Sequence, residues 1–337
     1  MLDKRAAYTD ALVKEAERRL PVEVGNNDIK SVYFGGGTPS LLELTDIERI
    51  LSCIPHKDGI EITLEANPGD LTEDKLTGLR ALGVNRLSMG IQSFNDENLT
   101  LLGRRHNAED AHMAIIAAKS AGFDNISIDL MYGLPYQSME EWEKELDEAL
   151  KSDIQHISTY QLTYEEGTPL IQLLKSGRIP PTDDDIANDM FDLAHKKLTL
   201  GGFEHYEVSN FAKTGRRSRH NSGYWTGMHY IGLGAGAHSY DGVERSWNPN
   251  GINAYIHGIT AQNLQRESEA LTEEQKRIEK IMLGMRTIEG VDEETVAHKK
   301  TTVMQLLDKG LIERKNNRIT ATLKGVHILN TIIEELI

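Results

Sequence analysis

The sequence repeats one short unit, an apolar run followed by a polar or glycine-rich loop and then a stretch with helical spacing. The runs and their loops are SVYF-GGGTPS, IEITLEA-NPGD, VNRLSMGI-QSFNDE, ISIDLMYGLP before residues 139–150, and HISTYQLTY-EEGTPL. Strands that alternate with helices predict parallel β/α units. Because the ends of these strands keep carrying polar residues, we expect an α/β fold with a barrel-type site at the carboxyl rim.

This alternation of strand-like and helix-like segments stops after residue 210. Residues 211–265 are rich in Gly, His and aromatic residues and are expected to form loops with short strands, whereas residues 266–337 read as helices with a small hairpin, a winged-helix-like pattern. We therefore predict a partial β/α barrel over 1–210, a connecting region over 211–265 and a helical accessory domain over 266–337. Winged helices often bind DNA, but acidic residues are as common as basic ones here. Packing against the barrel is the better interpretation.

Charge and composition narrow the function classes. The formal net charge of −15 opposes broad binding to nucleic acid, because phosphates would be repelled. No apolar stretch approaches the roughly 20 residues that span a bilayer, and the N-terminal residues lack a signal-peptide core, so we expect a cytoplasmic protein. A single cysteine, Cys53, excludes an internal disulfide and any site built from several thiolates of one chain.

The three glycines at 35–37 do not have the spacing of a phosphate loop, since no Gly-Lys-Ser/Thr follows and they are contiguous. Taken alone, the three glycines would indicate a turn. The polar residues after the other strands would, one at a time, indicate helix caps or side chains that hold a loop in place. Their joint position after consecutive strands predicts one rim that binds a zwitterionic ligand with a sugar, such as an amino-acid–nucleoside. The residues concerned are Gly35–Thr38, Glu65, Gln92, Arg104 and Asp129.

Several motifs in fixed order resemble the radical S-adenosylmethionine family of oxygen-independent coproporphyrinogen oxidases, and more closely its relatives, the HemW-type heme chaperones. They are YFGGGTPSLL, ITLEANPGD, GVNRLSMGIQSFNDENLTLLGRRHN, ISIDLMYGLP and YQLTYEEGTPL, and the similarity runs from about residue 8 to the C-terminus. The resemblance implies a partial barrel of six β/α units with a C-terminal helical domain. It also implies contacts to S-adenosylmethionine from Gly36, Gly37, Thr38, Glu65, Gln92, Arg104 and Asp129.

One part of the family pattern is absent. The family normally begins with a strand and a C-x3-C-x2-C loop that holds a 4Fe–4S cluster, whereas residues 8–20 here resemble the helix after that loop. Cys53 lies far from any such position and is expected to be a structural residue. We therefore expect no 4Fe–4S cluster on this chain as given. Either a segment precedes Met1 in the native protein, which we favour, or the chain is a cluster-free descendant.

Residues 219–225, RHNSGYW, resemble the HNxxYW motif that marks the heme chaperones within the family. His220 offers an imidazole for iron, and Tyr224 and Trp225 offer flat faces for a macrocycle. Arginines of the basic island at 215–220, Arg219 among them, could pair with propionates. Asn221 completes the predicted heme site.

Other interpretations of this region stay open. RHNSGYW could be a turn whose Tyr and Trp fill core. His229 and His238 are alternative iron ligands, although their nine-residue spacing matches no standard zinc pattern. GLGAGAHS at 232–239 looks like a dinucleotide loop, but no βαβ unit surrounds it, and we discount it.

The resemblance implies a heme chaperone that binds heme and passes it to recipient hemoproteins, membrane-bound ones among the alternatives. A rival function is oxygen-independent coproporphyrinogen III dehydrogenase, which decarboxylates two propionates through a deoxyadenosyl radical. A third is a scaffold that has lost both ligands. The HNxxYW-like residues favour the chaperone, and no nucleic-acid partner is expected.

Overall fold

The computed structural model describes residues 4–337, which divide into two compact units. The barrel unit contains residues 33–41 and 62–218, and the terminal unit contains the residues up to 32, residues 42–61 and residues 219–337. Both are discontinuous in sequence. Within residues 4–337, no helix is long and apolar enough to cross a bilayer. The domain limits predicted at residues 210 and 265 remain predictions.

A seven-stranded sheet forms the barrel unit in the order β1-β2-β3-β4-β5-β7-β6. Strands β2 to β5 are parallel, and the antiparallel hairpin β6–β7 then ends the sheet. This arrangement confirms the predicted α/β fold with a partial barrel. The strands are β1 (Ser31–Phe34), β2 (Glu61–Ala66), β3 (Arg86–Gln92), β4 (Ile126–Tyr132), β5 (His156–Gln161), β6 (Glu204–Glu207) and β7 (Asn210–Ala212).

Side chains alternate along these strands, so that the sheet has one apolar and one polar face. The strand register places polar residues beside polar residues, as in the pairs Thr63–Arg86, Ser127–His156 and Asp129–Ser158. The intervening residues, such as Leu64, Leu87, Met89, Ile128 and Ile157, are fully buried and supply the core. We call the side that carries the polar pairs the polar face of the sheet.

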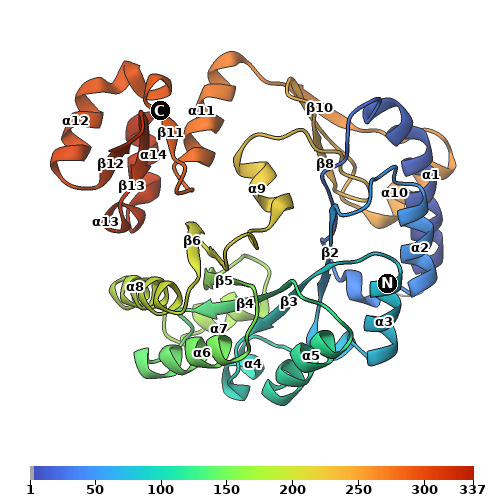
Figure 1. The fold of residues 1–337 in the computed structure, drawn as a ribbon, viewed down its shortest axis with the longest axis horizontal. Coiled ribbons are helices and arrows are strands. Elements are labelled where there is room, and N and C mark those ends of the chain that lie inside the picture. Colours follow the sequence, from blue (N-terminus) through green and yellow to red (C-terminus); the bar gives the residue numbers. More distant parts are fainter. Residues whose placement is uncertain (1–3) are drawn as a thin grey trace. The chain divides into compact units, whose positions relative to one another are not determined.

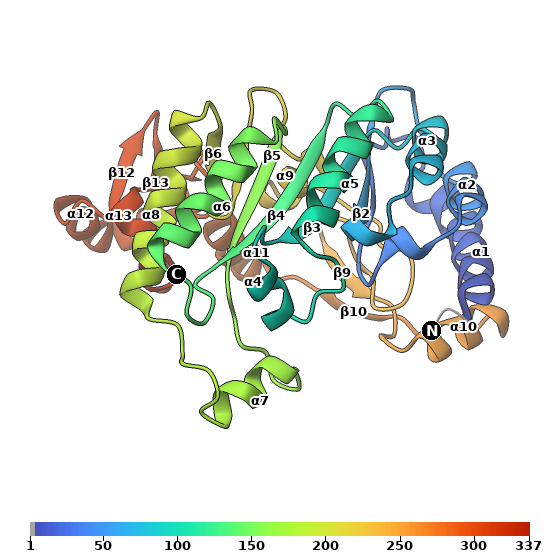
Figure 2. The same ribbon diagram turned by 90° about the horizontal axis from the view of Figure 1, so that it is seen from below.

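Helices α5, α6 and α8 lie along one side of strands β3 to β5 (Figures 1 and 2). Helix α6 begins with a capping box, in which Ser138 and Glu141 satisfy each other's backbone N–H groups. Its Trp142 is fully buried and donates from Nε1 to the carbonyl of Met190 on α8, at 2.8 Å. The helices are α3 (Glu73–Ala81), α4 (Asp96–Leu101), α5 (Ala108–Ser120), α6 (Met139–Lys151), α7 (Pro169–Lys175) and α8 (Asp184–Leu200), with short 3-10 turns η2 (Pro39–Leu41) and η3 (Pro68–Asp70).

The terminal unit holds two small antiparallel sheets, ordered β10-β9-β8 and β11-β13-β12. The second sheet contains the hairpin that the sequence predicts near the C-terminus. The elements are α1 (Arg5–Glu23), α2 (Leu44–Ser52), α9 (Arg219–Trp225), β8 (His238–Tyr240), β9 (Glu244–Trp247), α10 (Ile252–Thr260), β10 (Glu267–Ala270), α11 (Glu273–Gly284), β11 (Val291–Asp292), η4 (Glu293–Lys299), α12 (Lys300–Asp308), β12 (Ile312–Lys315), β13 (Arg318–Ala321), α13 (Leu323–Val326) and α14 (Leu329–Leu336).

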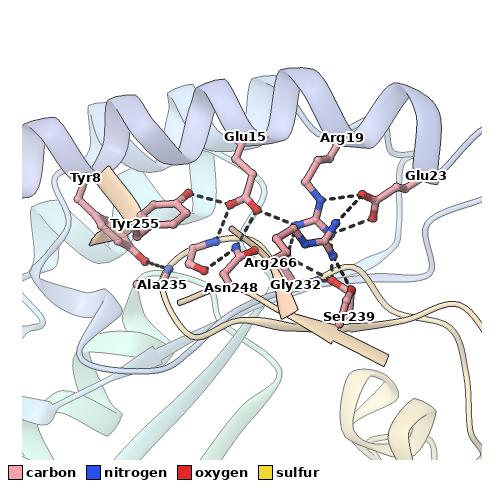
Figure 3. A network of polar contacts seen from close by, with 12 residues as sticks. Tyr8, Glu15, Arg19, Glu23, Gly232, Ala235, Ser239, Asn248, Tyr255 and Arg266 are labelled. Carbon is pink, nitrogen blue, oxygen red and sulfur yellow. Dashed lines mark hydrogen bonds and ion pairs between the residues drawn. The ribbon is translucent and has the colours of Figure 1, made fainter. Parts of the chain in front are cut away.

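A buried carboxylate, Glu15 on α1, joins segments of the terminal unit that lie far apart in sequence (Figure 3). It accepts hydrogen bonds from Tyr255 Oη at 2.7 Å, Asn248 Nδ2 at 2.7 Å and the Gly234 amide at 2.8 Å. Arg19 pairs with it at 2.7 Å. With four donors around one carboxylate, the charge of Glu15 is well compensated although its side chain is 1% exposed.

We expect Glu15→Ala to lower the free energy of unfolding by about 3–5 kcal/mol, because it leaves the buried Tyr255 hydroxyl and Gly234 amide without their acceptor and removes one of the two carboxylates that pair with Arg19. Urea denaturation followed by circular dichroism measures this. Glu17→Ala, on the exposed side of the same helix, is the matched control and should change stability by less than about 0.5 kcal/mol. Equal losses in the two variants would contradict the structural role of Glu15.

Candidate functional site

The loop after β1 needs its glycines for two different reasons. Gly36 and Gly37 have φ angles of +75° and +72°, the left-handed region that other residues rarely adopt, and a Cβ atom on either would meet open space. Gly35 instead packs closely, since a Cβ atom there would lie 2.6 Å from the ring of Tyr33. Thr38 is half-buried and its carbonyl accepts from the Leu41 amide at 3.1 Å, which starts η2. The loop therefore presents exposed backbone that a ligand can approach closely.

Glu65 of β2 fixes this loop. Its carboxylate accepts from Tyr33 Oη at 2.8 Å and from the Gly36 amide at 3.2 Å. Burial and the Glu65 charge together raise the pKa of Tyr33, so that the phenol stays protonated and keeps donating. Glu65 thus lies beside the glycine loop, as the sequence predicts, with its two oxygens also supporting the loop.

Gln92 and Arg104 meet above the end of β3. Gln92 has φ +69°, a strained value for this residue type, and the β3–β4 register shifts between Met89 and Gln92. Arg104 Nη2 donates to the Gly90 carbonyl at 2.9 Å and to Asn67 Oδ1 at 2.7 Å. Asn67 is a member of this group that the sequence reasoning missed. Its position directly after β2, in NPGD, was the available signal.

Asp129 of β4 is half-buried on the same polar face. Burial raises its pKa to about 6, although a hydrogen bond from Ser158 and the charge of Arg86 act in the opposite direction. The carboxyl therefore changes its charge near neutral pH. Glu65 contacts Gly36 near the end of β2, and Asp129, in the middle of β4, lies within electrostatic reach of Glu65.

The predicted heme residues belong to α9 in the terminal unit, which is a short helix and not a turn. Its first amides, those of Arg219 and His220, donate to the carboxylate of Glu61 at 3.1 and 3.0 Å. The His220 ring is held at both nitrogens, with Nδ1 3.0 Å from Ser31 Oγ and Nε2 3.1 Å from Tyr224 Oη. His220 is thus a positioned side chain, and its Nε2 already has a partner.

Aromatic rings continue from α9 into the following strands. Tyr224 is 41% exposed and makes edge contacts with His220 and Tyr230, with ring centroids 5.1 and 4.8 Å apart. Tyr230 in turn lies beside Tyr240 of β8. Trp225 is half-buried, and its Nε1 is buried with no hydrogen-bond partner among the described residues. This N–H is a donor that lacks an acceptor, which is unusual for a buried indole.

Two arginines of the basic island at 215–220 form ion pairs within the barrel unit. Arg217 pairs with Glu204 at 2.7 Å, and Arg216 pairs with Asp124 at 3.2 Å. In the terminal unit, Arg219 is exposed, and its side chain makes no ion pair within residues 4–337. Of the three arginines considered for propionates, Arg219 therefore remains the available one. Asn221 is half-buried.

The two alternative histidines follow α9, with His229 in a loop and His238 at the start of β8. His238 stacks on Trp247 with centroids 5.6 Å apart and planes 23° apart, and both belong to the β8–β9 pair. His229 lies edge-on to Tyr240 at 6.1 Å and packs against Gly242, where a Cβ atom would come within 2.4 Å of its Nε2. Both histidines are exposed.

The loop at 232–239 does not present free amides to a phosphate. The Gly234 amide donates to Glu15, the Ala235 amide to Tyr8 Oη at 3.2 Å and the Gly236 amide to the Pro249 carbonyl at 3.0 Å. Figure 3 shows the contacts of this loop with Tyr8 and Glu15 of α1. It is therefore a structural loop, in line with the view that it is not a dinucleotide site.

Comparison with known proteins identifies the family. Residues 5–149 match the Radical SAM superfamily. The chain is 35% identical to the heme chaperone HemW of Bacillus subtilis, over 94% of this chain and 88% of that protein. It is 32% identical to HemW of Lactococcus lactis, over 98% and 89%.

The chain belongs to the HemW family of radical SAM proteins.

This result confirms the resemblance seen in the sequence. Among solved structures, coproporphyrinogen III oxidase (HemN) from Escherichia coli matches with a TM-score of 0.84, over 100% of this chain and 84% of that chain. At 22% identity this likeness concerns the fold, which HemW proteins and HemN share.

The radical SAM superfamily implies a 4Fe–4S cluster, and the residues of this chain do not fit one. Three thiolates normally hold such a cluster, whereas Cys53 ends α2 with its Sγ donating to the Arg49 carbonyl at 3.3 Å. Within residues 4–337, no group of three or more His, Cys, Asp or Glu side chains is arranged to bind a metal ion. We derive no chemical step from a cluster.

The same superfamily implies S-adenosylmethionine, and here the residues fit. The open backbone at Gly36 and Gly37 gives a ligand close approach, while Glu65 and Asp129 supply acidic groups and Arg104 a guanidinium for a carboxylate.

We expect Asp129→Asn to stabilise the fold at pH 8 by about 1–2 kcal/mol and to have little effect at pH 4. The raised pKa means that folded Asp129 holds its proton more tightly than the unfolded chain, so ionising it costs stability as pH rises from about 4 to 6. Urea denaturation at both pH values measures this. A variant that is less stable than the parent at pH 8 would contradict it.

Proposed function

We propose that this protein is a heme chaperone that binds heme beside α9 and transfers it to hemoproteins. The observation that carries the proposal is its membership of a family whose Bacillus and Lactococcus members, similar over nearly their whole length, are named heme chaperones. The proposed location beside α9 is supported by the RHNSGYW segment, in which α9 combines an imidazole, an exposed phenol and an indole.

Heme is a flat, largely apolar ring with two propionates, and each part of it has a matching group here. The exposed ring of Tyr224 offers a face for stacking, and the indole of Trp225 has an N–H that lacks an acceptor. A propionate oxygen would satisfy that buried N–H once the groups that cover it move aside. The exposed guanidinium of Arg219 suits the second propionate, and an exposed pair of this kind contributes about 0–1 kcal/mol. Ring burial and iron ligation would therefore supply most of the affinity.

His220 is the proposed iron ligand, and its hydrogen bonds shape how it would act. The neutral imidazole can bind iron through Nε2 only after the bond to Tyr224 Oη is exchanged. Ser31 Oγ stays on Nδ1 and fixes the ring orientation. His229 and His238, which are exposed, are the alternative ligands.

S-adenosylmethionine is proposed to bind at the strand ends, through Gly36, Gly37, Thr38, Glu65, Gln92, Arg104 and Asp129. When bound, this group would supply a positively charged sulfonium and an amino-acid moiety, which the two acids and Arg104 complement. We propose weak binding, because no cluster iron is available from this chain to hold the amino and carboxylate groups.

The rival function, coproporphyrinogen III dehydrogenase, has no specific observation in its favour. The likeness to HemN supports the fold alone. The recipient hemoproteins, membrane-bound ones among them, and a cytoplasmic location remain predictions from the sequence.

Titration of hemin into the protein should give a saturable change in the Soret band. His220→Ala should shift that spectrum, since it removes the proposed ligand. Trp225→Ala should speed heme loss about tenfold, since ring contact and the indole N–H are removed together. Absorbance spectra and transfer of heme to an apo-globin measure these effects.

His238→Ala and Trp247→Ala are the matched controls, because they remove the other histidine–tryptophan pair of the terminal unit. They should retain the parent's spectrum and off-rate. If the His220 and Trp225 variants kept the parent's spectrum and off-rate while the two controls changed them, the heme would bind at β8 and β9 and the proposed site would be wrong.

Calorimetric titration with S-adenosylmethionine should detect weak binding that Glu65→Ala and Asp129→Ala abolish. Affinity should fall below about pH 6, where Asp129 gains a proton and loses its charge. Asp74→Ala, an exposed acid on α3, controls for the loss of one negative charge. If both site variants bind as the parent does, the pocket lies elsewhere.

A further inference from the structure

Arg86, the first residue of β3, is one of the largest fully buried side chains in the described part of the chain. It is 1% exposed, and its Nε and Nη1 are buried without any hydrogen-bond partner. An arginine side chain keeps its positive charge in proteins. A buried charge without compensation costs several kcal/mol, so a folded protein normally places a counter-charge beside it.

A second donor without a partner lies next to Arg86. Thr63 of β2 is its direct neighbour in the parallel register, which places the two side chains on the same, polar face of the sheet. Thr63 is 0% exposed, and its Oγ1 is also buried without a partner. Three guanidinium N–H groups and one hydroxyl are thus unsatisfied on neighbouring strands.

The histidine near Arg86 already has hydrogen-bond partners at both ring nitrogens. His156 of β5 is 1% exposed, with Nδ1 2.7 Å from Ser127 Oγ and Nε2 2.8 Å from Tyr206 Oη. Burial and the charge of Arg86 lower the pKa of His156 well below its usual value, so the ring is neutral. This Ser127–His156–Tyr206 chain contributes no negative charge.

The nearby acid is not an ion-pair partner either. Asp129 lies within electrostatic reach of Arg86, but no carboxylate among residues 4–337 comes within 4.0 Å of the Arg86 nitrogens. A close pair with an arginine would hold the pKa of Asp129 below its usual range, whereas burial raises it to about 6. Among residues 4–337, Arg86 therefore has no counter-charge at ion-pairing distance.

We propose that Arg86 and Thr63 hold a small inorganic anion, chloride, in the interior of the barrel unit. Ser127 and His156, together with Arg86 and Thr63 themselves, are at most 1% exposed, so a ligand at this position would be shielded from solvent, which favours a compact ion over an elongated one. A monatomic anion accepts several donors without a required geometry of its own. This site is separate from the predicted strand-end contacts and does not depend on the proposed function.

Bromide tests the proposal on the unmodified protein. Crystals of the full chain grown with sodium bromide in place of chloride should show an anomalous scattering peak within hydrogen-bonding distance of Arg86 and Thr63 Oγ1. A protein whose bromide peaks all lie on the surface, with none at Arg86, would overturn the proposal.

Thermal unfolding gives a second test in solution. Replacing gluconate by chloride at constant ionic strength should raise the Tm of the parent by about 2–4 °C, because chloride binds only the folded state. Arg86→Gln should lose this rise, while Arg105→Gln, which removes a 76% exposed guanidinium, should keep it. A parent Tm that does not respond to chloride, or an undiminished response in Arg86→Gln, would refute the site.

Discussion

The alternation of polar and apolar side chains along β2 to β5 is the constraint on which the barrel unit depends. One set, including Leu64, Leu87 and Ile128, forms the core, and the other set faces away from it. Since adjacent side chains on a strand point to opposite faces, a slip of one residue would bury the polar set in the core. The requirement for a core thus fixes the register, and the register places Thr63 beside Arg86 and Asp129 beside Ser158.

This logic explains why much of the barrel site could be predicted from the sequence. The end of a strand is visible as a change from apolar to polar residues, and parallel strands bring those ends together. Gly36 and Glu65 meet in the structure for that reason. Asn67 was not predicted because NPGD has the composition of an ordinary turn, and its contact with the side chain of Arg104 joins residues far apart in sequence.

Helix α9 shows what local sequence could not predict. RHNSGYW contains Asn and Gly, which favour turns, and Gly223 packs where a Cβ atom would lie 2.7 Å from Met228. The helix begins because Glu61, 158 residues away from Arg219, accepts its first amides. The antiparallel hairpin β6–β7 likewise could not be predicted from local sequence, because its pairing with β5 joins residues far apart in the chain. The contact between Ser31 and the His220 ring also joins residues far apart in sequence, so local sequence could not predict it.

The contacts of Glu15 also set an order for biosynthesis. The carboxylate of Glu15 can accept its hydrogen bond from Tyr255 only after that residue, 240 positions later in the chain, has been synthesised. At the pace of a ribosome, about 5–20 residues per second, α1 spends roughly 10–50 s with Arg19 but without the three later donors to Glu15 all in place. During that interval residues 62–218 are completed, so the barrel unit can fold before the terminal unit assembles from its separated segments. Helix α1 is thus synthesised before the barrel unit but completes its contacts only after it.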